Sequence, residues 1–351
     1  MIKIDVDERK WKKIKEEHSE WYSDNILPNI RNAYEFIESQ KSKSYSMKKY
    51  LELLKKIIDK GKDFIIQKEL FLDYENKEID KIIKIMKKKN KKSKSILEIR
   101  FEKLKIPEKY LPESLFSYEK LQRGNKKWSR HKLLSLMKIE VCTYCQRNYI
   151  SSYEENNDNK PEENNDKKTT ATLDHFYPKA DYPFLALSLY NFIPSCYVCN
   201  TVFKNGKEVQ IYPYEEGFDE LGVKFRISGK VINEILGEKD SDFSVEIDCK
   251  NIEDKEKENK VKKSIDNLGL DRVYEKSHNQ YIQDLLYTIE KYPENYLEAC
   301  GEMFENDNDK KKQLKEYFKD IVKEPYRKRI ENGEPLAKLT KDILEEFNIK
   351  I

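Results

Sequence analysis

The chain has 351 residues, of which 38% are charged and 12% aromatic, and its formal net charge is +3. This composition is typical of a globular protein with one large domain or two to three small ones. No apolar run approaches the roughly 20 residues that a membrane helix needs, and the N-terminal sequence MIKIDVDERKW has no signal-peptide core. We therefore expect a cytoplasmic protein with no membrane partner.

The charge is distributed unevenly along the chain. Residues 1–150 contain 37 Lys and Arg against 23 Asp and Glu, a net charge of +14, whereas residues 151–351 contain 31 against 42, a net charge of −11. A basic half suits a polyanionic partner such as DNA. The alternative is a compositional bias toward Lys, Asn and Ile, but such a bias does not explain why the acidic residues concentrate after residue 150.

Residues 1–122 are predicted to form a basic helical domain. Apolar residues recur there at spacings of three and four, which is typical of helices packed around a shared core. The stretch 81–94 begins as an amphipathic helix and ends in a lysine-rich run. Such a run is either a solvated helix end or an arm that follows phosphates. Examples of the expected core positions are Trp11, Ile14, Trp21, Leu54 and Ile57.

A second basic cluster lies at 123–132, just before the first cysteine pair. Trp128 opens a short predicted helix, 129–138, whose apolar side chains face inward. Lys126, Lys127 and Arg130 are our candidates for contacts with the DNA backbone, and an ordinary solvated surface is the alternative. No base-reading motif is visible, so we expect little sequence specificity.

Two CxxC pairs are the most informative motif of the chain. Cys142 and Cys145 form the first pair, and Cys196 and Cys199 form the second. Each CxxC turn directs two thiolates at one metal, so two turns together predict a four-cysteine zinc site. A disulfide or a set of free thiols is the alternative. Residues 152–169 are acidic, rich in Asn and nearly free of apolar side chains, which predicts a mobile insertion between the pairs.

An Asp-His dipeptide lies between the two cysteine pairs. Asp174 follows an apolar residue, and Pro178 comes soon after His175. Hydrolysis of a phosphodiester needs a base to activate water and a cation on the phosphate. A carboxylate can hold a cation, and an imidazole with a pKa near neutrality can accept a proton. A lone histidine is usually structural, but the neighbouring aspartate and the flanking cysteines favour a catalytic role here.

The stretch CTYCQRNY…TLDHFYPKADYPFLALSLYNFIPSCYVCNTVFKNG resembles an HNH endonuclease of the ββα-metal type. The shared order is CxxC, an acidic residue with His, an Asn, and a second CxxC followed directly by His or Asn. The resemblance covers roughly residues 128–215. The helix before Cys142 and the later stretch 265–271 are also similar to HNH proteins of prokaryotic anti-phage systems such as the Septu type, in which the nuclease works beside an ATPase.

The resemblance implies a role for each matching residue. His175 is expected to be the general base, open to substrate, with its other ring nitrogen held by a backbone carbonyl. Asp174 and Asn200 are expected to bind the catalytic Mg²⁺ or Mn²⁺, because carboxylate and amide oxygens are hard ligands. Asn191 is expected to brace the loop that orients the base. Lys204 either touches phosphate or, as the more ordinary interpretation, is a solvated lysine.

The C-terminal region, 216–351, is predicted to hold a small β patch followed by helices. Apolar and polar residues alternate between 222 and 248, which predicts a hairpin or a three-stranded patch. From 256 onward the spacing of apolar residues is helical. No glycine-rich phosphate loop is present in the sequence, so any dependence on ATP has to come from a partner.

Together these patterns predict an α+β, mostly α protein. We expect a helical region at 1–122, a nuclease core with one structural zinc at 123–215, and the C-terminal region at 216–351. The expected function is metal-dependent cleavage of DNA as the effector of an anti-phage system. The alternative is a non-catalytic zinc-knuckle scaffold that binds nucleic acid or a protein. A binding knuckle has no need of Asp174, His175 and Asn191 together, which favours the enzyme.

Overall fold

The structure is a computed structural model that describes residues 1–68, 106–125, 127–155, 166–228, 243–275, 277–291 and 323–349. Within these ranges the fold is α+β and mostly helical, as the sequence predicts. The strands of the described part form three separate two-stranded antiparallel sheets. None of the described helices is long and apolar enough to cross a membrane.

The N-terminal helices are α1 (Glu8–Asn25), α2 (Leu27–Glu38) and α3 (Tyr45–Lys60), followed by the short 3₁₀ helix η1 (Gly61–Ile65). Asp7 caps α1 by accepting from Lys10 N, and Ser44 caps α3 by accepting from Met47 N. The predicted helical spacing is confirmed here, because residues such as Ile14 are buried. The lysine-rich stretch 81–94 lies outside the described residues.

A set of short helices leads to the first cysteine pair. They are η2 (Glu108–Tyr110), α7 (Pro112–Leu115), α8 (Tyr118–Arg123) and α9 (Arg130–Met137). Ser129 caps α9 by accepting from Lys132 N, so the predicted helix at 129–138 is confirmed. Gly124 ends α8 at φ +57°, and an added Cβ would lie only 2.3 Å from Ser129 Cβ. Only glycine fits that close approach.

A strand-strand-helix unit lies at the centre of the molecule. Strand β3 (Ala171–His175) pairs antiparallel with β4 (Phe192–Cys196), and Asp174 lies opposite Ile193. The connection contains the 3₁₀ helices η4 (Pro183–Leu185) and η5 (Leu189–Asn191). The π-helix η6 (Val198–Lys204) follows β4 directly. Short strands thus surround the Asp-His dipeptide, and a helix follows the second cysteine pair.

The stretch 152–169 is not a loop throughout. Strands β1 (Ser152–Glu155) and β2 (Asp166–Thr169) form its two ends and pair antiparallel, with Tyr153 opposite Lys168. The prediction of a mobile insertion is therefore wrong at both ends. Its polar composition argues against burial in a core, but an antiparallel hairpin can form outside a core through backbone hydrogen bonds. Residues 156–165 lie outside the described part of the chain.

The C-terminal region contains the predicted hairpin and helices. Strand β5 (Lys224–Ser228) pairs antiparallel with β6 (Ser244–Asp248), and α11 (Lys255–Asn267), α12 (Leu270–Glu275), α13 (Asn279–Lys291) and α16 (Ala337–Glu346) follow. Residues 323–331 are also helical. Asp342 of α16 is buried and accepts from Phe225 N at 2.8 Å, which fixes this helix along the free edge of β5.

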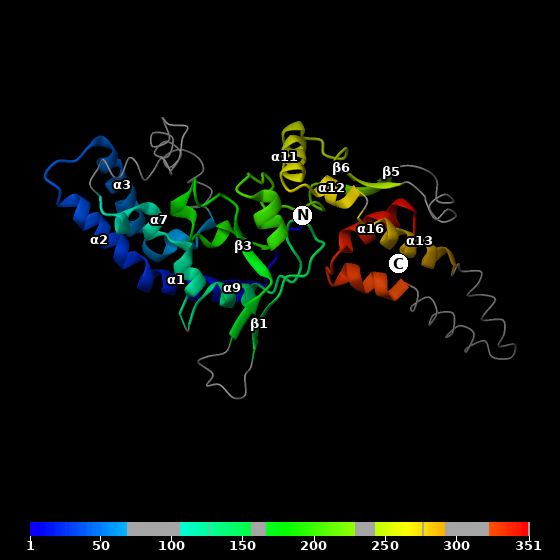
Figure 1. The fold of residues 1–351 in the computed structure, drawn as a ribbon, viewed down its shortest axis with the longest axis horizontal. Coiled ribbons are helices and arrows are strands. Elements are labelled where there is room, and N and C mark those ends of the chain that lie inside the picture. Colours follow the sequence, from blue (N-terminus) through cyan, green and yellow to red (C-terminus); the bar gives the residue numbers. More distant parts are fainter. Residues whose placement is uncertain are drawn as a thin grey trace.

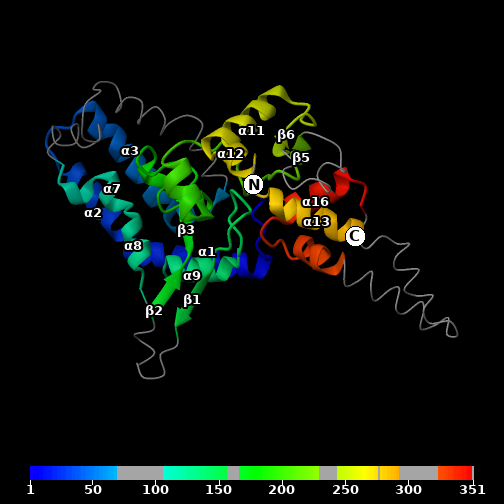
Figure 2. The same cartoon turned by 45° about the vertical axis from the view of Figure 1, so that its right-hand side comes forward.

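Helices α2 and α3 lie at one end of the molecule, and α13 and α16 lie toward the other, with β3 between them (Figures 1 and 2). The buried apolar side chains belong to one contiguous core that draws on all three predicted regions. Backbone contacts converge on the first cysteine turn, where Ile2 N donates to Thr143 O and Leu336 N donates to Gln146 O. The ends of the chain thus help to hold this turn.

Candidate metal centre and active site

The four cysteines meet at the base of the strand-strand-helix unit. Their Sγ atoms all lie within 4.8 Å of one another, and all four side chains are buried. Tetrahedral zinc with Zn–S bonds of about 2.3 Å separates its sulfurs by about 3.8 Å, so the cluster has the size of a zinc site. All four are free thiols rather than disulfides. The cluster can therefore hold a metal ion such as zinc.

Donors around the sulfurs support this assignment. Cys196 N lies 3.2 Å from Cys142 Sγ, Arg147 N lies 3.4 Å from Cys145 Sγ, and Asn148 Nδ2 lies 3.3 Å from Cys196 Sγ. Such N–H groups stabilise thiolates. Burial raises the pKa of the Cys142 thiol. Four crowded thiols therefore do not all ionise on their own, and a divalent metal provides the charge that stabilises four thiolates.

Asp174 lies beside this cluster and is only 5% exposed. Tyr144, from inside the first CxxC turn, donates its hydroxyl to Asp174 Oδ2 at 2.5 Å. Lys204 Nζ lies 3.1 Å from Oδ1 and 3.0 Å from Oδ2. Burial raises the pKa of the Asp174 carboxyl, while the neighbouring Lys204 ammonium opposes that change. The carboxylate is therefore held inside the protein by two partners.

Lys204 is 1% exposed, so it is neither a solvated lysine nor a surface contact for phosphate. Both sequence-based interpretations of this residue are wrong. The reason is its position at the end of η6, four residues after Asn200, on the face of the helix that packs against β3. There its ammonium also donates to the His175 carbonyl oxygen at 2.8 Å. A buried ammonium is tolerated only where it is paired in this way.

His175 ends β3, and Nε2 of its ring lies 2.9 Å from the Ala186 carbonyl oxygen. The predicted carbonyl contact is thus present, and it requires Nε2 to carry the proton. Nδ1 then has a free lone pair, and it has no hydrogen-bond partner among the described residues. His175 is 8% exposed, so the base is much less open than expected. Burial lowers the pKa of His175 to about 4, which keeps the imidazole neutral.

Asn191 braces the connection between β3 and β4, as predicted. Its Oδ1 accepts from Tyr177 N at 2.8 Å, and its Nδ2 donates to the Leu185 carbonyl at 2.9 Å. The next residue, Ala186, holds His175. On the outer side of the same segment, Nε2 of His18 from α1 bonds to the Leu187 carbonyl at 2.9 Å. The orientation of the His175 ring is therefore fixed from both sides of the loop.

Asn200 does not join Asp174 in a shared cation site. Its Nδ2 donates to Thr172 Oγ1 at 3.0 Å, which ties η6 to β3. Both carboxylate oxygens of Asp174 contact the Lys204 ammonium, and Oδ2 also accepts from the Tyr144 hydroxyl. The carboxylate is therefore directed at these two side chains and not at a vacant cation site. The residues expected to bind Mg²⁺ or Mn²⁺ therefore do not fit such an ion as they are arranged.

Basic side chains lie at the rim of the His175 site. Tyr118 packs edge-on against the His175 ring with centroids 4.9 Å apart, and its hydroxyl lies beside the Arg130 guanidinium. Lys179 Nζ stands 5.4 Å from the Tyr118 ring centroid. Burial raises the pKa of Tyr118 to about 12, and the nearby Arg130 guanidinium opposes this rise. Lys127 is exposed, and Lys126 lies outside the described residues.

Sequence reasoning missed Tyr144, Tyr118 and Lys179. Tyr144 had a usable signal, because it lies inside the CxxC turn and its position relative to the metal is fixed by the flanking cysteines. Lys179 follows the proline of the Asp-His segment by one residue, which also places it near the site. Tyr118 had no local signal, since it is far from His175 in sequence and reaches it only through packing.

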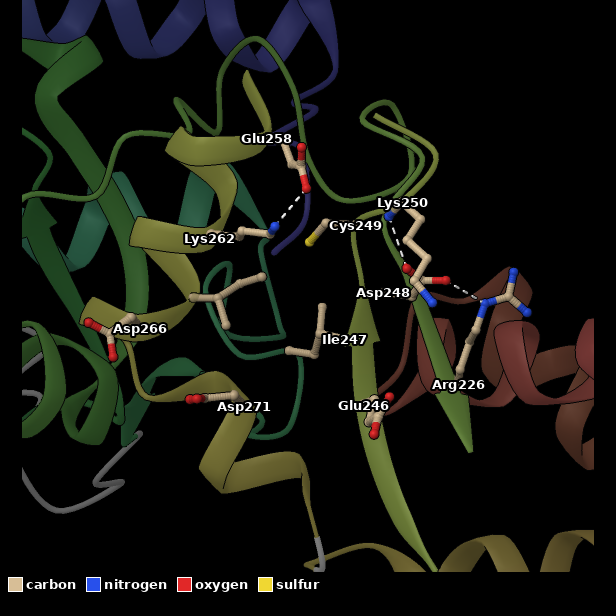
Figure 3. Close-up of a pocket in the computed structure, with 11 residues that line it drawn as sticks. Arg226, Glu246, Ile247, Asp248, Cys249, Lys250, Glu258, Lys262, Asp266 and Asp271 are labelled. Atoms are coloured by element: carbon tan, nitrogen blue, oxygen red, sulfur yellow. Dashed lines mark hydrogen bonds and ion pairs between the residues drawn. The ribbon is translucent and has the colours of Figure 1, made fainter. Parts of the chain in front are cut away.

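A cavity of about 410 Å³ lies away from this site, between the β5–β6 hairpin and α11. Figure 3 shows that charged side chains line it and that several are paired with one another. Arg226 Nε donates to Asp248 at 2.8 Å, and Lys262 donates to Glu258 at 2.6 Å. Cys249 is also at its wall, and burial raises the pKa of that thiol to about 11. The cavity therefore has no activated nucleophile.

Comparison with known proteins adds no family to these observations. No protein-family model, no curated protein and no solved structure matches the chain. The resemblance to HNH endonucleases stays a sequence-based interpretation. Function has to be inferred from the four cysteines and from the residues around His175.

Proposed function

We propose that the protein hydrolyses phosphodiester bonds in DNA, with His175 as the general base. One observation carries the proposal: the His175 ring is fixed through Nε2 on the Ala186 carbonyl, and its Nδ1 is left unprotonated and without a partner among the described residues. A base needs a free lone pair in a fixed direction. The ring lies at one end of the β3–β4 pair and Cys196 of the four-cysteine cluster at the other, within a strand-strand-helix unit, which is the arrangement expected of an HNH endonuclease core.

The charges around the ring suit a phosphate. Lys179 and Arg130 both lie near Tyr118, whose ring contacts His175. The Tyr118 hydroxyl, beside the Arg130 guanidinium, can also donate a hydrogen bond in the same place. A bound phosphate would raise the pKa of His175, because a nearby anion stabilises the imidazolium. The base would therefore become stronger when the substrate arrives.

The four-cysteine cluster has a structural role in this proposal. Cys142 and Cys145 flank Tyr144, which bonds to Asp174, and Cys196 and Cys199 lie at the junction of β4 and η6. One zinc ion would hold both chain segments in place and would take no part in the reaction. The proposal includes no Mg²⁺ or Mn²⁺ site on Asp174 and Asn200.

We also propose an anti-phage role beside an ATPase partner. The sequence resemblance is the support for both.

One observation favours the alternative of a non-catalytic zinc-knuckle scaffold. Asp174, Lys204 and Tyr144 satisfy one another in a buried network, as polar groups do in a structural core. Such a scaffold would bind DNA or a protein without chemistry. In the nuclease, the free lone pair of His175 Nδ1 accepts a proton from water. In the scaffold, it has no chemical role.

Cleavage of supercoiled plasmid DNA tests the proposal. The zinc-loaded parent should nick or linearise the plasmid, and His175→Ala should lose about 10²–10⁴-fold in rate, the usual effect of removing a general base. His131→Ala is a matched control, because His131 is also 8% exposed and its Nε2 lies 3.0 Å from a backbone carbonyl, that of Tyr153. The control should cut like the parent. DNA binding without any cleavage by the parent would support the scaffold instead.

A further inference from the structure

The Lys204 ammonium lies against the Asp174 carboxylate, where the sequence resemblance led us to expect a divalent cation. An ammonium has three donors, and three acceptors surround Nζ: the two Asp174 carboxylate oxygens at 3.1 and 3.0 Å and the His175 carbonyl oxygen at 2.8 Å. The side chain is 1% exposed, so water does not compete for these contacts. The ammonium is thus fully satisfied by protein oxygens.

The Asp174 carboxylate is also largely occupied. An ionised carboxylate offers about four lone-pair positions. Lys204 uses one on each oxygen, and the Tyr144 hydroxyl uses one on Oδ2. Mg²⁺ requires oxygens at about 2.0–2.1 Å in octahedral geometry. Binding it to Asp174 would place two cations on one carboxylate and would displace at least one of these partners.

We infer that Lys204 supplies the positive charge at this site in place of a divalent cation, so that Asp174 is the partner of an internal ammonium and not a ligand for Mg²⁺ or Mn²⁺. The inference deepens the proposed function and rests on it for the reaction. Lys204 acts as a positioning residue, because its contacts reach Asp174 and the backbone of His175 and not the surface where a phosphate would bind.

Two consequences follow for the chemistry. The charge of Asp174 is balanced by folding alone, so a divalent cation that acts on the phosphate would have to bind at other residues. The same ammonium fixes the end of β3 through the His175 carbonyl, and it therefore helps to hold the base in place. Zinc bound by the four cysteines remains necessary for the fold, because the Tyr144 hydroxyl that bonds to Asp174 comes from the first cysteine turn.

Binding of Mn²⁺ to the zinc-loaded protein, followed by electron paramagnetic resonance, tests the inference without relying on activity. The parent and Asp174→Asn should show the same Mn²⁺ binding curve. The double variant Asp174→Asn, Lys204→Met replaces the ion pair with neutral side chains of similar size, so it serves as a second comparison if the single variant does not fold. It should also match the parent. A Mn²⁺ ion held by the parent and lost in either variant would overturn the inference.

The dependence of cleavage on Mg²⁺ or Mn²⁺, with zinc retained, gives the second arm. Any cleavage by Asp174→Asn should respond to either ion over the same concentration range as cleavage by the parent. A response that shifts to higher ion concentration in Asp174→Asn would overturn the inference, even if the binding curves agree. A parent that cuts no DNA under any condition counts against the proposed function alone, and the Mn²⁺ comparison then still decides whether Asp174 holds a divalent cation.

Discussion

Replacing Lys204 by Met should destabilise the protein strongly, because it leaves the Asp174 charge buried without its main partner. Asp174 is 5% exposed and Lys204 is 1% exposed, so solvent screens neither charge. Removing one member of a buried ion pair typically costs about 3–5 kcal/mol, whereas replacing both members with neutral groups of similar volume is often close to neutral. We therefore expect Asp174→Asn, Lys204→Met to recover most of the free energy of unfolding lost in Lys204→Met.

Urea unfolding of the zinc-loaded proteins, followed by near-UV circular dichroism, measures these differences. The single variant should also regain stability as the pH falls, because the unpaired buried carboxyl has a folded-state pKa above its unfolded value and takes up a proton first in the folded state. Lys262→Met is the control, since Lys262 pairs with Glu258 at 60% exposure and its loss should change the free energy of unfolding little. Equal losses in Lys204→Met and Lys262→Met would refute the reasoning.

The remaining predictions concern the metal, the pH and the DNA. Cys142→Ser should release zinc and lower solubility, so elemental analysis should find zinc in the parent and much less in the variant. Burial lowers the pKa of His18 from 6.5 to about 4, so the unfolded chain takes up a proton first as the pH falls through that range. The free energy of unfolding should then drop by up to about 3 kcal/mol, at roughly 1.4 kcal/mol per pKa unit, and His18→Gln should flatten the decline. Replacing Arg130 and Lys179 together by Gln should weaken DNA binding and reduce the slope of log affinity against log salt by about 0.9 for each lost phosphate contact. An unchanged slope would mean that DNA approaches from another face.

The parts of the site that follow local rules could be predicted from the sequence. Two CxxC pairs bring thiols together because each turn is short, and the four sulfurs do meet. Alternating residues around Asp174 form a strand, and the residues after Cys196 form a helix, because both patterns are set within a few neighbouring positions. The Ser129 cap of α9 is also local, because its hydroxyl accepts one hydrogen bond from Lys132 N, three residues later.

The pairing of Lys204 with Asp174 could not be predicted in the same way. It depends on which face of η6 turns toward β3, and the unusual π-helical turn shifts that face relative to an ordinary helix. The burial of His175 depends on Tyr118, which comes from a helix distant in sequence. Trp128 Nε1 donates to His18 Nδ1 at 2.9 Å across a similar separation. Such long-range contacts decide whether a charged or titratable side chain meets solvent, and no local pattern specifies them.

Rescue of His175→Ala by added imidazole tests the central claim most directly. If Nδ1 of His175 accepts a proton from the attacking water, small-molecule imidazole diffusing into the space left by the ring should restore part of the cleavage rate. The restored rate should follow the concentration of neutral imidazole as the pH is varied. The His131→Ala control should show no response to imidazole. Cleavage by His175→Ala at the parent rate without imidazole, or a reduced rate that imidazole does not raise, would contradict the account.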